Sequence, residues 1–198
     1  MSATNGRPTL TKEAMGIRPG LPLEASEGGI EELRRDIQHL MDIEAIKQLK
    51  HAYFRCLDTG NREEMRTLFL DDAAVHYVGG NYEWKFDDPD AFLEAVGASF
   101  TRKSIGHHNA HTPEIQVLSA TEATGIWYFC DDMYILEHGF HTTGSGIYWD
   151  EYEKKGGSWR IRATRYRRIY EWSGPTAEKR TLSSHYLGEF GPEPPAGG

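Results

Sequence analysis

The 198-residue sequence contains only two cysteines, Cys56 and Cys130, and they do not form a CxxC pair. This excludes a disulfide-stapled scaffold and indicates a reducing environment. No apolar run approaches the roughly 20 residues that a membrane-spanning helix requires. The N-terminus also lacks the basic and then apolar layout of a secretory signal. We therefore predict a cytoplasmic protein that does not associate with membranes.

Positive charge is also limited, because 22 Lys and Arg stand against 30 Asp and Glu and give a formal net charge of −8. Nucleic-acid affinity comes largely from Lys and Arg side chains that displace counterions, so we predict no nucleic-acid partner. Aromatic residues are abundant instead, with 5 Trp, 10 Tyr and 8 Phe. They could line a pocket for a bulky hydrophobic or aromatic small molecule, or fill a core and an oligomer interface.

Composition divides the chain into one domain with two extensions. Residues 1–28 are rich in Gly, Pro and Ser/Thr, which predicts a flexible or surface-draped arm. Residues 29–172 contain the periodic segments and form the predicted domain. Residues 173–198 are again rich in Pro, Gly and Glu and predict a C-terminal tail.

Three helices are predicted in the first half. The second begins at Asn61 with a capping box, and the third begins at Asp88, followed by Pro89. The first ends near "DTGN", where Gly60 can adopt a left-handed conformation. This first helix carries a one-sided apolar stripe at steps of three and four residues: Ile30, Leu33, Ile37, Leu40, Ile43, Ile46, Leu49 and Tyr53.

The second half is dominated by strand signals. Two short strands flank Gly79 and Gly80, and a longer antiparallel meander runs from residue 113 to residue 172. Helices followed by a meander indicate an α+β fold. We expect about three N-terminal helices packed on one curved antiparallel sheet, with a cone-shaped cavity between the two layers.

Side-chain alternation places Asp131 on one strand face with three apolar residues, Trp127, Phe129 and Met133. A carboxylate in these surroundings is paired, has a raised pKa, or lies at the open end of the strand bonded to backbone. We predict that five side chains facing the cavity contact the substrate: Trp127, Phe129, Met133, Tyr166 and Tyr170.

In the last strand, the alternation of inward-facing and outward-facing side chains shifts by one residue, which predicts a β-bulge between Ala163 and Tyr166. The bulge would turn Tyr166, Arg168 and Tyr170 toward the cavity. Arg168 could then pair with Asp131. Alternatively, the segment "RYRR" is an ordinary solvated basic edge.

Tyr53 and Asp58 lie at the end of the first helix, five residues and therefore about 140° apart. They can share a cavity only if the helix ends at Asp58, as "DTGN" suggests. Otherwise Asp58 is a loop residue without a function.

Three histidines, His107, His108 and His111, fall within five positions. A metal site would require them to converge, as ligand pairs do on a helix. Pro113 disfavours a helix here, and an extended segment turns His107 and His108 to opposite faces. The pattern favours one histidine as an acid–base group, and we predict no metal.

Together these segments resemble the bile acid 7α-dehydratase family, in the SnoaL-like branch of the NTF2-like superfamily, which also includes scytalone dehydratase and polyketide cyclases. The similarity spans roughly residues 42–170 and is looser across 71–106. It is carried by "DIEAIKQLKHAYFRCLD" (42–58), "HHNAHTPEI" (107–115), "EATGIWYFCDD" (122–132), "DEYEKKGGSWRI" (150–161) and "YRRIY" (166–170).

The resemblance implies a cofactor-free lyase with five catalytic residues: Tyr53, Asp58, His108, Asp131 and Arg168. His108 would be the main acid–base group, oriented by Asp58 or Asp131. Tyr53 would donate a hydrogen bond where negative charge develops. Arg168 would hold Asp131 ionised.

The reaction that the resemblance implies is dehydration of a hydroxysteroid of the bile-acid type. The same groups could instead cleave a C–C bond and release formaldehyde from a lignin-derived diarylpropane or a similar aryl diol. A non-catalytic ligand-binding or association module is a third interpretation, because fold alone does not give function. The resemblance also implies a homo-oligomer, with a trimer through the convex sheet face favoured.

Overall fold

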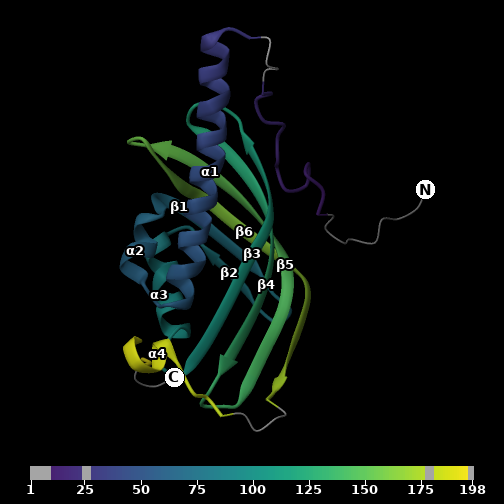
Figure 1. The fold of residues 1–198 in the computed structure, drawn as a ribbon. Helices are drawn as coiled ribbons and strands as arrows, with labels where there is room; N and C mark the ends of the chain where they lie inside the picture. Colours follow the sequence, from purple (N-terminus) through teal and green to yellow (C-terminus); the bar gives the residue numbers. More distant parts are fainter. Residues whose placement is uncertain (1–9, 24–27, 177–180, 196–198) are drawn as a thin grey trace, which may run out of the picture.

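A computed structural model describes residues 10–23, 28–176 and 181–195. In these residues the chain forms four helices and six strands (Figure 1). In chain order they are α1 (Ile30–Asp58), α2 (Arg62–Thr67), β1 (Phe69–Val78), β2 (Glu83–Phe86), α3 (Pro89–Ser99), β3 (Ser104–Val117), β4 (Glu122–Ile135), β5 (Phe140–Lys155), β6 (Ser158–Pro175) and α4 (Tyr186–Phe190).

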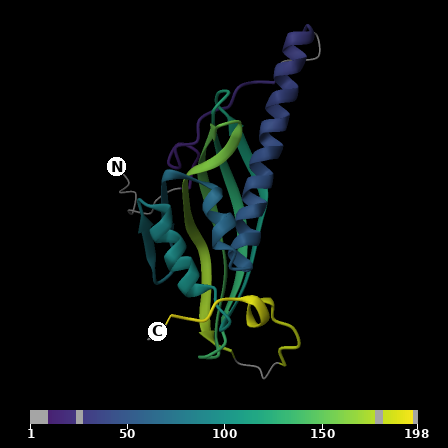
Figure 2. The ribbon, with the colours of Figure 1, turned by 90° about the vertical axis from the view of Figure 1, so that its left-hand side faces the viewer.

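The six strands form one curved, open sheet in the order β2-β1-β6-β5-β4-β3, and helices α1 to α3 cover one of its faces (Figures 1 and 2). This confirms the predicted α+β architecture. The expected purely antiparallel sheet is wrong in one place, because β6 pairs antiparallel with β5 but parallel with β1. Strand β6 lies between β1 and β5 and runs in the same direction as β1.

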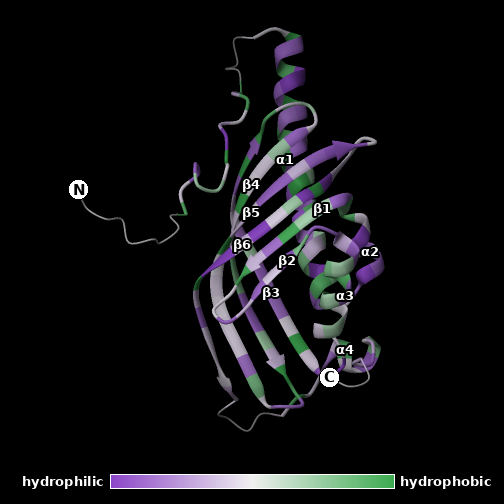
Figure 3. Cartoon of the chain, turned by 180° about the vertical axis from the view of Figure 1, so that it is seen from behind, coloured by the Kyte–Doolittle hydropathy of each residue, from purple (hydrophilic) through white to green (hydrophobic). Residues whose placement is uncertain are grey.

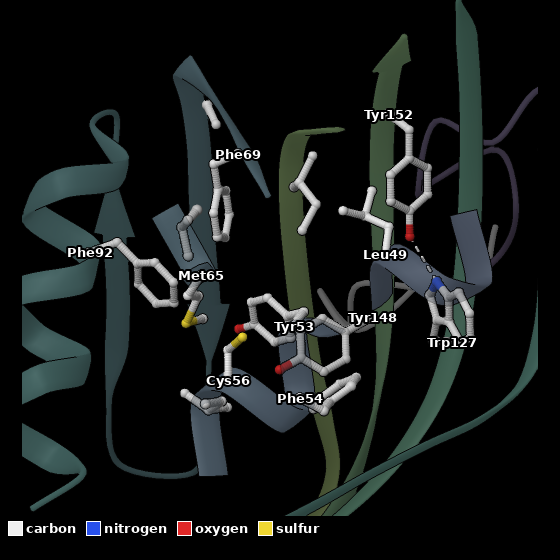
Figure 4. Close-up of a cluster of buried hydrophobic side chains, with 14 of the residues drawn as sticks. Leu49, Tyr53, Phe54, Cys56, Met65, Phe69, Phe92, Trp127, Tyr148 and Tyr152 are labelled. Carbon is white, nitrogen blue, oxygen red and sulfur yellow. Dashed lines mark hydrogen bonds between the residues drawn. The ribbon is translucent and has the colours of Figure 1, made fainter. Parts of the chain in front are cut away.

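Aromatic side chains from α1 and the sheet form the core between the two layers. Tyr53 and Phe54 of α1 pack edge to face against Tyr148 of β5, with ring centroids 6.4 and 5.7 Å away (Figure 4). Deeper in the core, the Trp127 indole donates a hydrogen bond of 2.9 Å to the Tyr152 hydroxyl. The contacts of Tyr53 and Phe54 fix the C-terminal half of α1 on the sheet and therefore set the positions of the residues at the end of this helix.

The helix ends agree with their sequence signals. The Asn61 side chain accepts a hydrogen bond from the Glu64 backbone, and the Asp88 side chain accepts one from the Asp90 backbone. Gly60 has φ of +65°, the left-handed conformation expected directly after α1. Asp58 is consequently the last helical residue, at the end of α1.

The prediction of a one-sided apolar stripe on α1 is wrong, because only the second half of the stripe packs on the sheet and the first half lies on the opposite side of the helix. Ile46 is fully buried, whereas Ile30 is 69% and Leu33 57% exposed. The N-terminal half of the helix extends past the edge of the sheet (Figures 1 and 2). Among the described residues, α1 is too charged to cross a membrane and the other helices are too short.

Strand β6 contains two irregularities where the sequence predicted one. The β5–β6 register shifts opposite Arg162 and again opposite Ile169, each time by one extra residue in β6. The predicted bulge between Ala163 and Tyr166 is therefore wrong in position. The first shift precedes Ala163 and turns Tyr166 and Arg168 inward, as expected. The second shift reverses the alternation again, so the side chains that had been inward after the first shift are followed by ones of the opposite phase.

The structure describes parts of both predicted extensions, while residues 1–9, 24–27, 177–180 and 196–198 lie outside the described residues. In the N-terminal arm, Leu21 donates a backbone hydrogen bond of 2.7 Å to Val117 at the end of the edge strand β3. Strand β6 runs to Pro175, beyond the predicted domain boundary. Part of the predicted tail forms α4, and the buried Leu187 of α4 packs beside Gly60.

Candidate active site

A cavity of about 230 Å³ opens between the concave sheet face, the end of α1, and α3. Half of its sixteen lining residues are aromatic: Tyr53, Tyr77, Tyr82, Trp84, Phe92, Phe100, Tyr148 and Tyr166. The polar groups in the lining include His108, Asp131 and Arg168. Such a space suits a largely apolar ligand that a few polar contacts orient.

His108 of β3 is held by the C-terminal end of α1. Its Nδ1 lies 2.6 Å from Asp58 Oδ1, and its backbone N–H donates a 2.8 Å hydrogen bond to Asp58 Oδ2. Phe54 and Phe100 flank the imidazole, with ring centroids 6.1 and 5.7 Å away. One carboxylate therefore fixes both the backbone and the ring of His108, and two phenyl rings restrict its rotation.

The contact with Asp58 determines which imidazole nitrogen faces the cavity as a base. An ionised carboxylate only accepts hydrogen bonds, so Nδ1 of His108 carries the proton in this pair. Nε2 then presents its lone pair to the cavity. The distance from Nε2 to Asp131 Oδ2 is 3.8 Å, too long for a hydrogen bond but short enough for Asp131 to attract an imidazolium.

Asp131 of β4 lies directly across the β3–β4 pair from His108, and Arg168 of β6 binds it with both prongs of its guanidinium. The two distances are 2.5 Å (Nη1–Oδ1) and 2.7 Å (Nη2–Oδ2). The Arg168 Nε lies 3.0 Å from Glu171 Oε2. Burial opposes the charge on Arg168, but its hydrogen bonds to Asp131 and the charge effects of Asp131, Tyr82 and Tyr166 together outweigh burial and raise the pKa of the guanidinium. Arg168 therefore stays positively charged, and its bidentate contact orients Asp131.

Tyrosine hydroxyls provide the remaining polar groups of the wall. The Tyr53 and Tyr77 hydroxyls lie 2.7 Å apart, and the Tyr77 hydroxyl donates to the Thr164 hydroxyl at 3.4 Å. Burial raises the pKa of both phenols above the ordinary value for tyrosine. They therefore remain protonated at neutral pH. Because Tyr77 donates to Thr164, Tyr53 is the donor in the Tyr53–Tyr77 pair, and its hydroxyl must turn away from Tyr77 to donate to a bound oxygen.

Four of the five predicted catalytic residues line the cavity, namely Tyr53, His108, Asp131 and Arg168, and Asp58 contacts His108 from the side. Asp58 is the last helical residue, and only 8% of the Arg168 side chain is exposed. Asp58 is therefore not a loop residue, and Arg168 does not lie on a solvated basic edge.

The predicted substrate-contacting residues divide into two groups. Met133 and Tyr166 line the cavity. Trp127 and Phe129 face the same layer but lie buried behind the lining, where Phe129 packs under the Arg168 guanidinium at 5.1 Å. The prediction for Tyr170 is wrong, because the extra residue Ile169 turns Tyr170 to the outer face, where it is 47% exposed.

The three clustered histidines lie on two faces of the sheet. His108 faces the cavity, while His111 stacks on the outward Tyr128 ring at 5.2 Å and His107 is exposed. Within the described residues, no group of three His, Cys, Asp or Glu side chains is arranged to hold a metal ion. The extended backbone thus separates the histidines, as the alternation argument predicted.

Sequence reasoning did not select Tyr77, Tyr148 or the aromatic residues of β2 and α3 as cavity residues. Alternation in β1 places Val75 and Tyr77 on one face, so a signal for Tyr77 was present. For Tyr148 the signal depends on the β4–β5 register, which pairs it with Trp127. Register is set in the folded sheet and is not encoded in either strand alone.

Comparison with known proteins gives one family and a consistent fold. A profile of the SnoaL-like domain matches residues 38–165. A hexachlorocyclohexane dehydrochlorinase (LinA type 3) from Novosphingobium barchaimii superimposes with a TM-score of 0.62 at 20% identity, over 75% of this chain and 99% of that chain.

Two further solved structures share this fold. A candidate scytalone dehydratase from Novosphingobium aromaticivorans gives a TM-score of 0.59 at 22% identity, over 72% of this chain and 98% of that chain. A protein of unknown function from Mycobacterium tuberculosis gives 0.57 at 24% identity, over 73% of this chain and 78% of that chain.

Proposed function

The chain belongs to the SnoaL-like domain family, within the NTF2-like fold, and from that premise we propose that it is a cofactor-free lyase. It acts by acid–base chemistry on a bulky, hydrophobic, hydroxylated substrate. One observation carries the proposal: Asp58 holds Nδ1 of His108 at 2.6 Å, which leaves Nε2 facing an aromatic cavity as a base. Proteins of this fold are described as a dehydrochlorinase and a candidate dehydratase, and both descriptions denote eliminations, which supports the same class of reaction.

In a dehydration, Nε2 of His108 removes a C–H proton that a carbonyl activates, directly or through a conjugated C=C bond. The electron pair of that bond forms a C=C bond as the C–O bond to the hydroxyl breaks, and the imidazolium returns its proton to the departing oxygen to give water. The Tyr53 hydroxyl exchanges its hydrogen bond to Tyr77 for one to the carbonyl oxygen, where negative charge develops. Asp131, held by Arg168, stabilises the imidazolium from 3.8 Å.

A hydroxysteroid of the bile-acid type is the substrate class that the family resemblance favours. Apolar side chains such as Leu57, Val96 and Met133 line the cavity beside its aromatic rings and suit a polycyclic skeleton. The hydroxyl that leaves would be positioned against Nε2 of His108. The carbonyl that activates it would lie at the Tyr53 hydroxyl.

A second candidate reaction is supported by the eight aromatic rings in the cavity lining. In an aryl diol with a hydroxymethyl arm, Nε2 of His108 would remove the O–H proton of that arm. The C–C bond then breaks to release formaldehyde, its electrons form a C=C bond, and the neighbouring hydroxyl leaves as water with the same proton. Aromatic side chains suit aryl substituents because rings stack and pack edge to face.

The test compares the purified protein with His108→Ala and Asp58→Asn on a hydroxylated 3-oxo-4-ene steroid and on a diarylpropane diol. Formation of the conjugated product and release of formaldehyde are both measured. We expect His108→Ala to lower turnover about 10²–10⁴-fold with an unchanged circular dichroism spectrum. Asp58→Asn also lowers turnover, because an amide no longer selects the Nδ1–H tautomer. Undiminished turnover in His108→Ala would remove His108 from the mechanism.

The alternative hypothesis, a non-catalytic binding module, predicts a different result in the same assays. It predicts that neither product forms while an aromatic or steroid ligand still binds and raises the melting temperature. The convergence of His108 and Asp58 beside an open cavity supports the lyase instead.

We also propose a homotrimer through the convex sheet face. Large side chains are exposed on this face, among them Tyr128, Tyr170 and Trp172, and Trp172 is 73% exposed. Burial of such a surface is a common basis for self-association. A monomeric molar mass in light scattering at micromolar concentration would contradict it.

A further inference from the structure

An apolar stripe lies exposed on the part of α1 that extends past the sheet. Ile30, Leu33, Ile37 and Leu40 are 69, 57, 49 and 54% exposed. Figures 1 and 2 show this part of the helix clear of the sheet, and Figure 3 shows green hydrophobic bands along it. A contiguous exposed apolar patch of this kind marks an interaction surface rather than scattered surface residues.

The helix geometry explains why the sheet of the same chain leaves this stripe uncovered. Ile37 lies nine residues before the fully buried Ile46, which at about 100° per residue is 900°, or half a turn after two full turns. The same nine-residue step separates the exposed Leu40 from the buried Leu49. The exposed stripe therefore lies on the side of α1 opposite the stripe that packs on the sheet.

The projecting half of α1 is attached to the sheet through polar contacts on its inner side. Asp42 accepts hydrogen bonds from Lys154 Nζ at 2.7 Å and from Trp159 Nε1 at 2.9 Å. Because the inner side is bonded in this way, the helix cannot rotate its outer stripe onto the sheet without breaking a buried charged contact.

The spacing of the stripe identifies its partner as another α-helix with the same pattern. Ile30 and Ile37 occupy a positions and Leu33 and Leu40 occupy d positions of two heptads. A β-branched residue at a with Leu at d favours a parallel two-stranded coiled coil. The next a and d positions are Glu44 and Lys47, so the apolar seam ends where α1 meets the sheet.

We propose that the outer stripe of α1 (Ile30, Leu33, Ile37 and Leu40) pairs in parallel with the same stripe of a second copy of this chain. The interface is isologous, because each stripe is its own complement about a twofold axis. The g position of one helix, Asp36, meets the following e position of the other, Met41, so the flanks do not bring like charges together. The two globular bodies lie on the outer sides of the helix pair, because each sheet is opposite the seam.

Ile37→Glu tests the seam, and Arg35→Gln is its control, because both changes lower the net charge by one and position 35 lies on the other side of the helix. Analytical ultracentrifugation of the full-length chain measures the molar mass. We expect Ile37→Glu to halve the molar mass and Arg35→Gln to leave it unchanged. If the sheet-mediated trimer exists, the halved species is that trimer. If it does not, the halved species is the monomer.

Cross-linking gives a direct measurement in a Cys130→Ser background, in which the native Cys56 is buried. Ile37→Cys should form a disulfide with itself across a parallel seam, and Arg35→Cys should not. An unchanged molar mass in Ile37→Glu together with no cross-link at position 37 would overturn the proposal. Binding of the wild-type chain to anionic phospholipid vesicles, with the molar mass unaffected by Ile37→Glu, would identify a lipid surface as the occupant instead. Turnover is measured on each variant, since the catalytic side chains are at the other end of α1 and a failed seam leaves the proposed lyase intact.

Discussion

At the scale of single residues, Asp42 combines burial with a dense set of donors. Its Oδ1 accepts hydrogen bonds from Lys154, Trp159 and Gln38 at 2.7, 2.9 and 3.1 Å. Burial alone would raise the pKa of the Asp42 carboxyl, but these hydrogen bonds and the nearby Lys154 charge outweigh it and hold the pKa below 3.8. The folded state therefore binds this proton less readily than the unfolded chain does.

The depressed pKa makes Asp42 a source of stability that depends on pH. Its contribution is fully present above about pH 4 and is lost as pH falls through the lower folded value. Asp42→Asn should cost about 1.5–3 kcal/mol in free energy of unfolding at pH 7, with the difference from wild type shrinking below pH 4. Urea titrations at several pH values measure it. Asp72→Asn, at a side chain that is 75% exposed, is the control and should change little.

The sequence predicted the residues of the site better than it predicted their partners. Alternation placed Asp131 inside, and the "DTGN" signal placed Asp58 at a helix end. It left both carboxylates as possible partners of His108. The choice depends on Arg168, which occupies both oxygens of Asp131 and leaves Asp58 for the imidazole. That contact joins residues far apart in the chain, and no local pattern encodes it.

At the scale of elements, a buried ion pair joins α1 to β5 behind the cavity wall. Lys50 Nζ lies 2.8 Å from Asp150 Oδ2, and both side chains are fully buried. The ammonium also lies 3.8 Å from the centroid of the Tyr148 ring. Burial lowers the pKa of Lys50 below 10.5, and Asp150 offsets only part of this effect. Because the unfolded chain binds this proton more tightly, the stability of the wild type rises with pH from the lowered value up to about 10.5.

We expect Lys50→Met alone to destabilise the protein by about 3–5 kcal/mol, because it leaves the Asp150 carboxylate buried without a cation. Lys50→Met combined with Asp150→Asn should recover most of that loss, since the amide can still accept the 2.7 Å hydrogen bond from Tyr152. A double-mutant cycle by chemical denaturation measures the coupling. A loss in the double variant equal to the sum of the losses in Lys50→Met and Asp150→Asn would show that the two side chains act independently.

Element ends were predictable and strand register was not. Asn61, Asp88 and Gly60 act through contacts within a few residues, so their signals are local. The two irregularities of β6 depend on how β5 pairs with it, and the second one turns Tyr170 out of the cavity. A one-residue shift reverses every side chain that follows it.

At the scale of the whole molecule, the C-terminal segment closes the end of the helical layer beneath the site. Arg102 Nε donates to the Gly191 carbonyl at 2.9 Å, and His185 Nε2 donates to the Ser104 carbonyl at 2.8 Å. Leu187 is buried, and a side chain at Gly60 would come within 3.2 Å of its Cδ2. The segment therefore supports the turn that follows Asp58.

Leu187→Ala should lower the free energy of unfolding by about 2–3 kcal/mol, because it opens a cavity under that turn. Phe190→Ala, in the same short helix α4 but 70% exposed, should cost less than about 0.5 kcal/mol. Thermal and urea denaturation compare the two variants. Equal, small effects would mean that α4 contributes no stability to the domain.

The overall architecture followed from the order of helix and strand signals, because each helix and each hairpin is a local structure. Two global features did not. The parallel pairing of β1 with β6 joins segments about 90 residues apart. The exposed outer stripe of α1 is the other: its nine-residue offset puts it opposite the buried stripe, but a sequence does not show where the sheet ends.

The central place of β6 has a consequence for the chain as it is synthesised. Until β6 emerges from the ribosome, β1 and β5 each present an open strand edge, and Arg168 is not yet available to Asp131. Unpaired edges of this kind invite misassociation between nascent chains. The described part of the sheet can be completed only after β6 has been synthesised, which makes late, slow pairing of β1 and β5 with β6 the expected behaviour of this chain.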